Sequence, residues 1–120
     1  MKTAEARDTS GQLEQAIEGL RQKFLRDLDE RIFAFEDAMA QIRNGSNTQH
    51  ALRHIHAMAH KQAGIAPSLG FAQIGEISRD LEEKIEKTLS DPDCAEKHQA
   101  WHKSLELLLD EMEQQLPDLA

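Results

Sequence analysis

The stretch FAQIGEISRDLEEKIEKTLSDPD, residues 71–93, indicates most clearly how this chain folds. Its apolar side chains recur every three or four residues, at Phe71, Ile74, Ile77, Leu81, Ile85 and Leu89. This spacing places them along one side of an α-helix, because an α-helix completes a turn in about 3.6 residues. The Ser-Asp-Pro-Asp run at residues 90–93 then favours a turn. The stretch therefore predicts an amphipathic helix that ends before residue 91.

The same spacing occurs in three other stretches. The first predicts a single long helix with the apolar residues Leu13, Ile17, Leu20, Phe24, Leu28, Phe35, Met39 and Ile42. The second ends near Gly70 and carries Leu52, Ile55, Ala59, Ala66 and Leu69. The last ends at Pro117 and carries Trp101, Leu105, Leu108, Met112 and Leu116. Short connections make successive helices antiparallel neighbours, so we expect an all-α protein folded as an up-down-up-down four-helix bundle.

Two boundaries can be predicted from local residues. Asn44-Gly45 ends the first long helix, since glycine commonly follows a helix C-terminus. The next helix is expected to begin with a capping box, in which Ser46 and Gln49 bond free backbone N–H groups. We expect residues 1–9 to be frayed and residues 10–120 to form a single domain.

Composition excludes several classes of function. The chain has 120 residues, with 14 Lys and Arg against 22 Asp and Glu, for a net charge of −8. This charge argues against a nucleic-acid partner, because phosphate binding needs clustered basic side chains. A single cysteine, Cys94, excludes an internal disulfide and a cysteine-based zinc site. No apolar run approaches the roughly 18 residues of a membrane helix, and the charged N-terminus lacks an apolar signal segment, so we expect no membrane partner and a cytoplasmic location.

Six histidines stand out in this composition, and they form three pairs spaced four residues apart. The pairs are His50 with His54, His56 with His60, and His98 with His102. Each pair lies on one helix face and could chelate Zn²⁺, Cu²⁺ or Ni²⁺. Protein metal sites bring three or four ligands, however, and no histidine here has the glutamate three residues earlier that a di-metal bundle needs. We therefore assign no metal ligands, and a histidine-pair metal-binding bundle stays an alternative.

The surroundings of His60 differ from those of the other histidines. Its neighbours on the same helix face are His56, Ala57, Ala63 and Gly64, three of which have little or no side chain. Such a bare surface would let a second protein bring a reacting atom close to the imidazole. The same small residues would also let two helices pack closely. The residues by themselves leave both interpretations open.

The stretch AHKQAGIAPSLGF, residues 59–71, resembles the histidine-containing phosphotransfer (HPt) domain of bacterial His–Asp phosphorelays. That family has Ala-His, then Lys or Ala three residues after the histidine, glycine at four, and a second glycine at ten followed by an apolar residue. The matching residues are His60, Ala63, Gly64, Gly70 and Phe71. The pair Leu81-Glu82 matches a Leu-Glu pair on the family's next helix.

The resemblance implies a four-helix bundle that presents His60 from the middle of its second long helix. It implies that Nε2 of His60 accepts a phosphoryl group from an aspartyl phosphate on a receiver domain and passes it to another receiver. The partners would be response-regulator receiver domains or a hybrid histidine kinase, within two-component signal transduction. The receiver would supply Mg²⁺, and this chain would be a phosphocarrier that binds no cofactor and has no ATP site.

Other residues would have lesser roles in such a site. Supporting positions are Gly64 for clearance, Lys61 for positive charge, Ala63 and Gly70 from the motif, and Gln73 as a side chain that could reach the phosphoryl group. Candidate positions for partner docking are His56, Ala57, Met58, Ile65 and Phe71. For most of these side chains, an ordinary place in the core or in solvent is the competing interpretation.

Three residues depart from the family pattern. Ala63 stands where a lysine is common, and Lys61 could supply that charge instead. Gln62 stands where a buried apolar residue is usual, so it needs hydrogen-bond partners. Pro67 removes a backbone N–H and predicts a bend or an early helix end between residues 63 and 70. These departures keep a second alternative open, a partner-binding module of the same fold without phosphotransfer.

Overall fold

The computed structural model describes residues 2–116, and side chains from residue 11 onward. This part of the chain forms α1 (Lys2–Arg26), α2 (Leu28–Arg43), α3 (Thr48–Ile65), a short 3₁₀ helix η1 (Pro67–Leu69), α4 (Ala72–Ser90) and α5 (Ala95–Gln114). Residues 2–116 contain no strand, which confirms the predicted all-α class. Among these residues, no helix combines the length and the apolar character that crossing a membrane requires.

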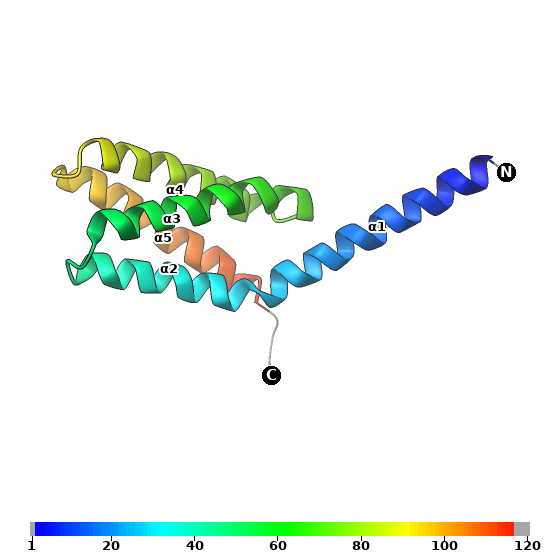
Figure 1. Cartoon of the computed structure of the whole chain (residues 1–120), viewed down its shortest axis with the longest axis horizontal. Coiled ribbons are helices and arrows are strands. Elements are labelled where there is room, and N and C mark those ends of the chain that lie inside the picture. The colour runs from blue at the N-terminus through cyan, green and yellow to red at the C-terminus, as the bar shows by residue number, and fades with distance from the viewer. Residues whose placement is uncertain (1, 117–120) are drawn as a thin grey trace.

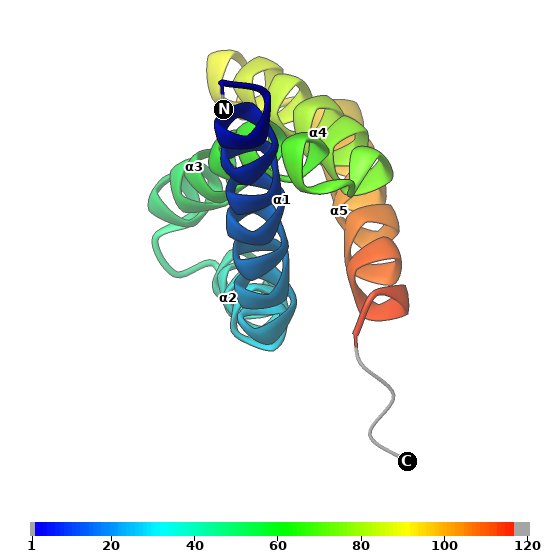
Figure 2. The same cartoon turned by 90° about the vertical axis from the view of Figure 1, so that its right-hand side faces the viewer.

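Helices α2, α3, α4 and α5 lie side by side, joined by short turns, while α1 extends away from them (Figure 1). Figure 2 shows the same four helices from the end at which α1 leaves. Their inward sides form one apolar core, in which Leu28, Ile55, Leu81, Leu105 and Leu108 have no exposed surface. Each such leucine or isoleucine contributes about 1.5–3 kcal/mol relative to an exposed one.

The single long helix expected over the first third of the chain is wrong. The chain bends at Asp27 into two helices, although the Asp27 N–H still bonds Lys23 O at 3.0 Å. Before the bend, Leu13 and Leu20 are 62% and 57% exposed rather than part of the core. Apolar spacing defines one side of a helix but does not determine whether another helix lies opposite, and none packs against this part of α1 in the described chain. The fraying expected for residues 1–9 stays a prediction.

The turn between α2 and α3 is where predicted but is built differently. Gly45 adopts a left-handed conformation (φ 74°), as expected after a helix C-terminus. The expected capping box is wrong, because α3 is preceded by Asn47, also left-handed (φ 48°), and has no side-chain cap bond. Ser46 belongs instead to the preceding helix end, where its N–H bonds Gln41 O at 3.0 Å.

The connection between α3 and α4 confirms the effect predicted for Pro67. Helix α3 ends at Ile65, and Pro67 begins the 3₁₀ turn, which closes at Gly70 with φ 92°. A Cβ atom at Gly75 would lie 2.4 Å from Pro67 Cγ, so α4 approaches this turn closely only because residue 75 has no side chain. The tight turn holds the C-terminal half of α3 against α4.

Gln62, the polar residue expected on a buried side of α3, has its hydrogen-bond partners. It is 1% exposed, and its Nε2 donates to Ser78 Oγ at 3.1 Å on α4. The same Nε2 approaches Met112 Sδ on α5 at 3.4 Å. Because a buried amide without partners destabilises a fold, these contacts explain how the core accepts a glutamine.

Candidate functional site

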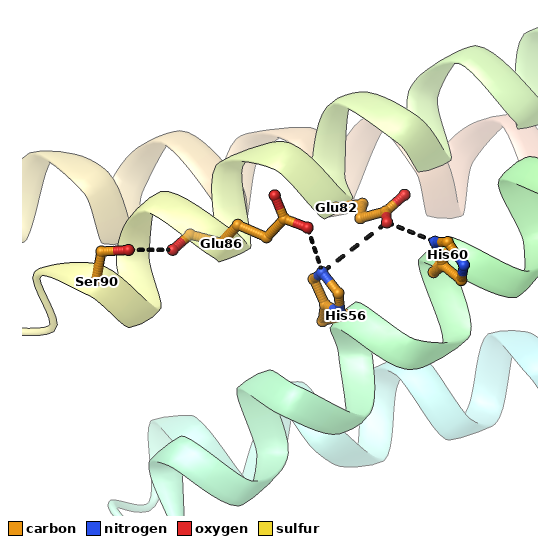
Figure 3. Close-up of polar contacts among 5 residues, drawn as sticks. All are labelled: His56, His60, Glu82, Glu86 and Ser90. Atoms are coloured by element: carbon orange, nitrogen blue, oxygen red, sulfur yellow. Dashed lines mark hydrogen bonds and ion pairs between the residues drawn. The ribbon is translucent and has the colours of Figure 1, made fainter.

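Two histidines of α3 face two glutamates of α4, as Figure 3 shows. His56 and His60 are one turn apart, and their rings are parallel, with centroids 6.5 Å apart. Glu82 and Glu86 have the same four-residue spacing on α4. Because both helices repeat at this interval, the two pairs of side chains meet across the groove between α3 and α4.

His60 is held by one ring nitrogen and open at the other. Its Nδ1 lies 2.6 Å from Glu82 Oε1, and the His60 side chain is 73% exposed, against 16% for Glu82. A carboxylate can only accept, so Nδ1 carries the hydrogen and the lone pair of a neutral ring is on Nε2. Nε2 has no hydrogen-bond partner among residues 11–116, and it points away from Glu82 (Figure 3). The geometry thus presents a fixed nucleophilic nitrogen to solvent.

The surface beside His60 is a shallow hollow between the two helices. It is lined by His60, Ala63 and Gly64 of α3 and by Arg79, Glu82, Glu83 and Glu86 of α4. Ala63 is buried, and a Cβ atom at Gly64 would meet no atom within 4 Å. Of the two interpretations of these small residues, close packing does not apply to Gly64, because no helix in the described part of the chain comes within 4 Å of a Cβ placed there. Gly64 leaves clearance beside the imidazole.

A second hollow lies on the opposite side of Gly64, toward α1 and α2. Its apolar floor includes Phe24, Ile65 and Leu69, and Lys23, Arg31 and Lys61 are the basic residues in its lining. Burial lowers the pKa of the Arg31 guanidinium, and the charge of Asp27 opposes this change. Positive charge therefore gathers in the hollow on one side of Gly64, where Asp27 partly offsets three basic residues. The groove on the other side of Gly64, which includes His60, carries three glutamates and Arg79.

The family comparison agrees with this arrangement. The Hpt domain family matches residues 3–119, nearly the whole chain. The chain belongs to the Hpt domain family. Hpt domains are the histidine phosphotransfer modules of His–Asp phosphorelays in two-component signal transduction, and they carry phosphoryl groups without an ATP site of their own. They interact with receiver domains and histidine kinases. Comparisons with curated proteins and with solved structures gave no match.

The other predicted site residues of this Hpt domain lie in different places relative to His60. Lys61 is exposed and lines the second hollow, together with Gly64 and Ile65. His56 is bound to Glu86 rather than turned to solvent, with Nε2 2.9 Å from Glu86 Oε1. Gln73 lines a third hollow with Arg21 and Glu111, not the one that holds His60.

The remaining positions are structural or partly so. Gly70 supplies the left-handed turn, and a Cβ atom there would lie 3.2 Å from Arg21 Nη1. Phe71 is 6% exposed and stacks on Phe24 at 5.0 Å, so it belongs to the core. Met58 is half-buried against that core, and Ala57 is exposed. Of the five docking candidates, Ala57 is exposed, His56, Met58 and Ile65 are half-buried, and Phe71 is buried, so docking through these positions stays a prediction.

Sequence reasoning missed two members of the site. The sequence pattern marks Glu82 only as half of the Leu81-Glu82 pair, and nothing in the pattern marks Arg79. The spacing of Arg79, Glu82 and Glu86 along α4, at three and four residues, was a usable signal for a shared face. Which face of α4 meets His60 depends on how α3 and α4 are rotated about their own axes. That rotation cannot be read from the apolar spacing of either helix.

Proposed function

We propose that Nε2 of His60 accepts a phosphoryl group from an aspartyl phosphate of a receiver domain and returns it to the aspartate of another receiver. The lone pair of Nε2 forms the N–P bond, the bond from phosphorus to the aspartyl oxygen breaks, and its electrons remain on that carboxylate. The observation that carries the proposal is the 2.6 Å bond from Nδ1 to Glu82, which leaves an exposed Nε2 as the nucleophile.

Glu82 would also stabilise the product. When Nε2 attacks the phosphorus atom, Nδ1 of the same ring still carries its hydrogen, so the phosphorylated ring is positively charged. The adjacent Glu82 carboxylate offsets that charge. Arg79, in the same hollow, offers a positive charge for the transferred group where the family's lysine is replaced by Ala63. Phosphoryl transfer depends mainly on positioning and charge neutralisation, so these two roles are sufficient on the carrier's side.

The receiver would supply the Mg²⁺ that the transfer needs, and this chain would bring no cofactor of its own to that step. The donor or acceptor is a response-regulator receiver or the receiver of a hybrid histidine kinase, in the cytoplasm. An acidic receiver pocket would be attracted to the hollow carrying Lys23, Arg31 and Lys61 beside Gly64. Helices α2–α5 would act as an up-down-up-down bundle whose α3 holds His60 rigidly while the partners exchange.

The test is transfer of labelled phosphate from a phosphorylated receiver to this chain. Wild type should take up label that is lost in acid and kept in alkali, as expected of phosphohistidine. The His60→Gln variant should take up none, whereas His54→Gln, an exposed histidine of the same helix, should behave as wild type.

Uptake of label by His60→Gln at the wild-type level would contradict the proposal. Binding of a receiver without any label transfer to wild type would also contradict it and would favour a partner-binding module instead.

A further inference from the structure

Beside His60, three side chains bring possible metal ligands together from two helices. One ligand atom each from His56, Glu82 and Glu86 lies within 4.8 Å of the other two. His56 Nε2 is 2.9 Å from Glu86 Oε1 and 3.9 Å from Glu82 Oε1 (Figure 3). An imidazole nitrogen and two carboxylates from neighbouring helices form a typical ligand set for a divalent ion.

The ion would replace the hydrogen that His56 Nε2 donates to Glu86, and that hydrogen would move to Nδ1 of the neutral ring. The spacing of the ligand atoms is then close to what a tetrahedral ion needs. With bonds of about 2.0–2.2 Å to nitrogen and oxygen, ligand atoms around tetrahedral Zn²⁺ lie about 3.3–3.6 Å apart. The two measured separations from His56 Nε2, 2.9 Å and 3.9 Å, lie on either side of that range. Small rotations of the glutamate side chains would equalise them.

Access and charge also favour an ion here. The His56, Glu82 and Glu86 side chains are 28%, 16% and 58% exposed, so an ion can enter from solvent and keep a water molecule as its fourth ligand. The Glu82 and Glu86 carboxylates each have an oxygen within 4.8 Å of the other, so their negative charges repel, and a divalent cation between them would remove that repulsion. The imidazole nitrogen favours a transition metal over Mg²⁺ or Ca²⁺, which prefer oxygen ligands.

We propose that His56, Glu82 and Glu86 form a binding site for a divalent transition metal, for which Zn²⁺ is the probe. This site is not the His–His chelate suggested by four-residue spacing, because His60 supplies none of the three ligands. It is nevertheless coupled to His60, since Glu82 Oε1 is also the acceptor for His60 Nδ1. A metal ion on Glu82 draws electron density from that acceptor and weakens its hold on the imidazole.

Calorimetric titration of the metal-free protein with Zn²⁺ tests the site directly. Wild type should bind with a dissociation constant in about the micromolar range. His56→Gln and Glu86→Gln should each weaken this binding by at least about 10-fold. His54→Gln and Glu76→Gln, which change an exposed histidine and an exposed glutamate of the same two helices outside this hollow, should leave it unchanged. Millimolar binding to wild type, or equal losses in the control variants, would overturn the proposal.

A variant could bind Zn²⁺ poorly because it is misfolded. Nitrogen NMR of the imidazoles in wild type identifies the metal ligands without relying on a variant. In wild type, Zn²⁺ should move the His56 Nε2 resonance as coordination does and leave His60 Nε2 uncoordinated. Direct coordination by His60 Nε2 would overturn the three-residue site in favour of a histidine-pair chelate.

The consequence for phosphoryl transfer rests on the proposed function and has its own measurement. Zn²⁺ should slow label uptake by wild type, and it should slow label uptake by Glu86→Gln much less. Each rate is compared with the rate of the same protein without metal. Equal slowing of both would overturn the coupling while leaving the calorimetric result intact. If wild type took up no label at all, the proposed function would fail, and the titration would still test the metal site.

Discussion

Two histidine pairs with identical spacing, on α3 and on α5, have opposite environments. In the first pair, His60 donates from Nδ1 to Glu82 at 2.6 Å and leaves Nε2 exposed. In the second, His98 donates from Nε2 to Pro92 O at 2.7 Å and accepts at Nδ1 from Trp101 Nε1 at 3.2 Å. Both ring nitrogens of His98 are therefore occupied by the protein, and the two rings carry their hydrogen on different nitrogens.

The difference shows what leaves a ring nitrogen of a helical histidine exposed to solvent. Four-residue spacing is the same in both pairs, so spacing cannot be the cause. His60 has a carboxylate on one nitrogen and small residues beside it, whereas His98 contacts the indole of Trp101, with ring centroids 6.3 Å apart. The first pair leaves one imidazole nitrogen open to solvent, and the second attaches the start of α5 to the preceding turn.

The largest effect is expected from removing the carboxylate that contacts each histidine pair. Glu82→Ala should slow phosphoryl uptake about 10- to 100-fold, because it releases Nδ1 and frees the ring to take other orientations. Glu106→Ala is the matched control, since Glu106 lies 3.4 Å from His102 Nδ1 on α5. Its uptake rate should equal that of wild type. Equal rates in the two variants would show that Glu82 does not position His60.

Removing an imidazole should lower the stability of the fold more at His98 than at His60, whereas phosphoryl uptake is expected to depend on His60. His98→Leu deprives the Trp101 N–H of its acceptor, and Trp101 is 2% exposed, so the free energy of unfolding should fall by about 1–3 kcal/mol. His60→Leu removes one donor from Glu82, which stays partly solvated and near His56, so the fall in the free energy of unfolding should be smaller, up to about 1 kcal/mol. Urea unfolding measures both values. A larger loss for His60→Leu would mean that the exposed histidine, not the fastened one, supports the fold.

A smaller effect is expected from filling the clearance beside His60. Gly64→Ala should raise the free energy of unfolding by up to about 1 kcal/mol, because alanine is the better helix former and the new Cβ meets nothing within 4 Å. It should also slow uptake from a receiver, whose approach the methyl group obstructs. Gly19→Ala in α1 is the control, since a Cβ there meets nothing either. It should leave uptake unchanged, and equal uptake by Gly64→Ala would remove the functional argument for this glycine.

The sequence predicts individual helices better than it predicts how they face one another. The apolar spacing at Phe71–Leu89 corresponds closely to α4, and Pro67 marks the early end of α3. The same reasoning extended a helix through Asp27, because backbone hydrogen bonding continues there and a local pattern shows no interruption. The exposure of Leu13 and Leu20 depends on a missing neighbour, which spacing cannot reveal.

Some residues of the candidate site can also be predicted from one helix, and others depend on how the helices pack. His60 and Gly64 could be selected from sequence, because small residues next to a histidine are visible along one helix. Glu82 lies 22 residues further on, and its contact with His60 depends on the rotation of α4 against α3. The partners of Gln62 on α4 and α5 depend on packing for the same reason. Contacts within one helix are encoded locally, and contacts between helices are not.

The smallest expected effect concerns Asp80, which joins the helix that orients His60 to the helix that carries His98. Asp80 Oδ2 accepts from Ser104 Oγ at 2.8 Å and lies 2.9 Å from Lys84 Nζ. Burial opposes ionisation of Asp80, but the hydrogen bonds from Lys84 and Ser104 and the charges of Lys84 and Lys87 outweigh it and lower the pKa of this carboxyl. Because the pKa is lower in the folded protein, ionised Asp80 stabilises the fold above the ordinary aspartate pKa of about 3.9. That stabilisation is lost as the pH falls through the lowered value.

The melting temperature of wild type should therefore decline below about pH 4, and the melting temperature of Asp80→Asn should decline less steeply over the same interval. The effect is modest, since the Asp80 side chain is 50% exposed and solvent screens the pair. Identical acid profiles for the two proteins would show that this link between the two histidine-bearing helices does not depend on the charge of Asp80.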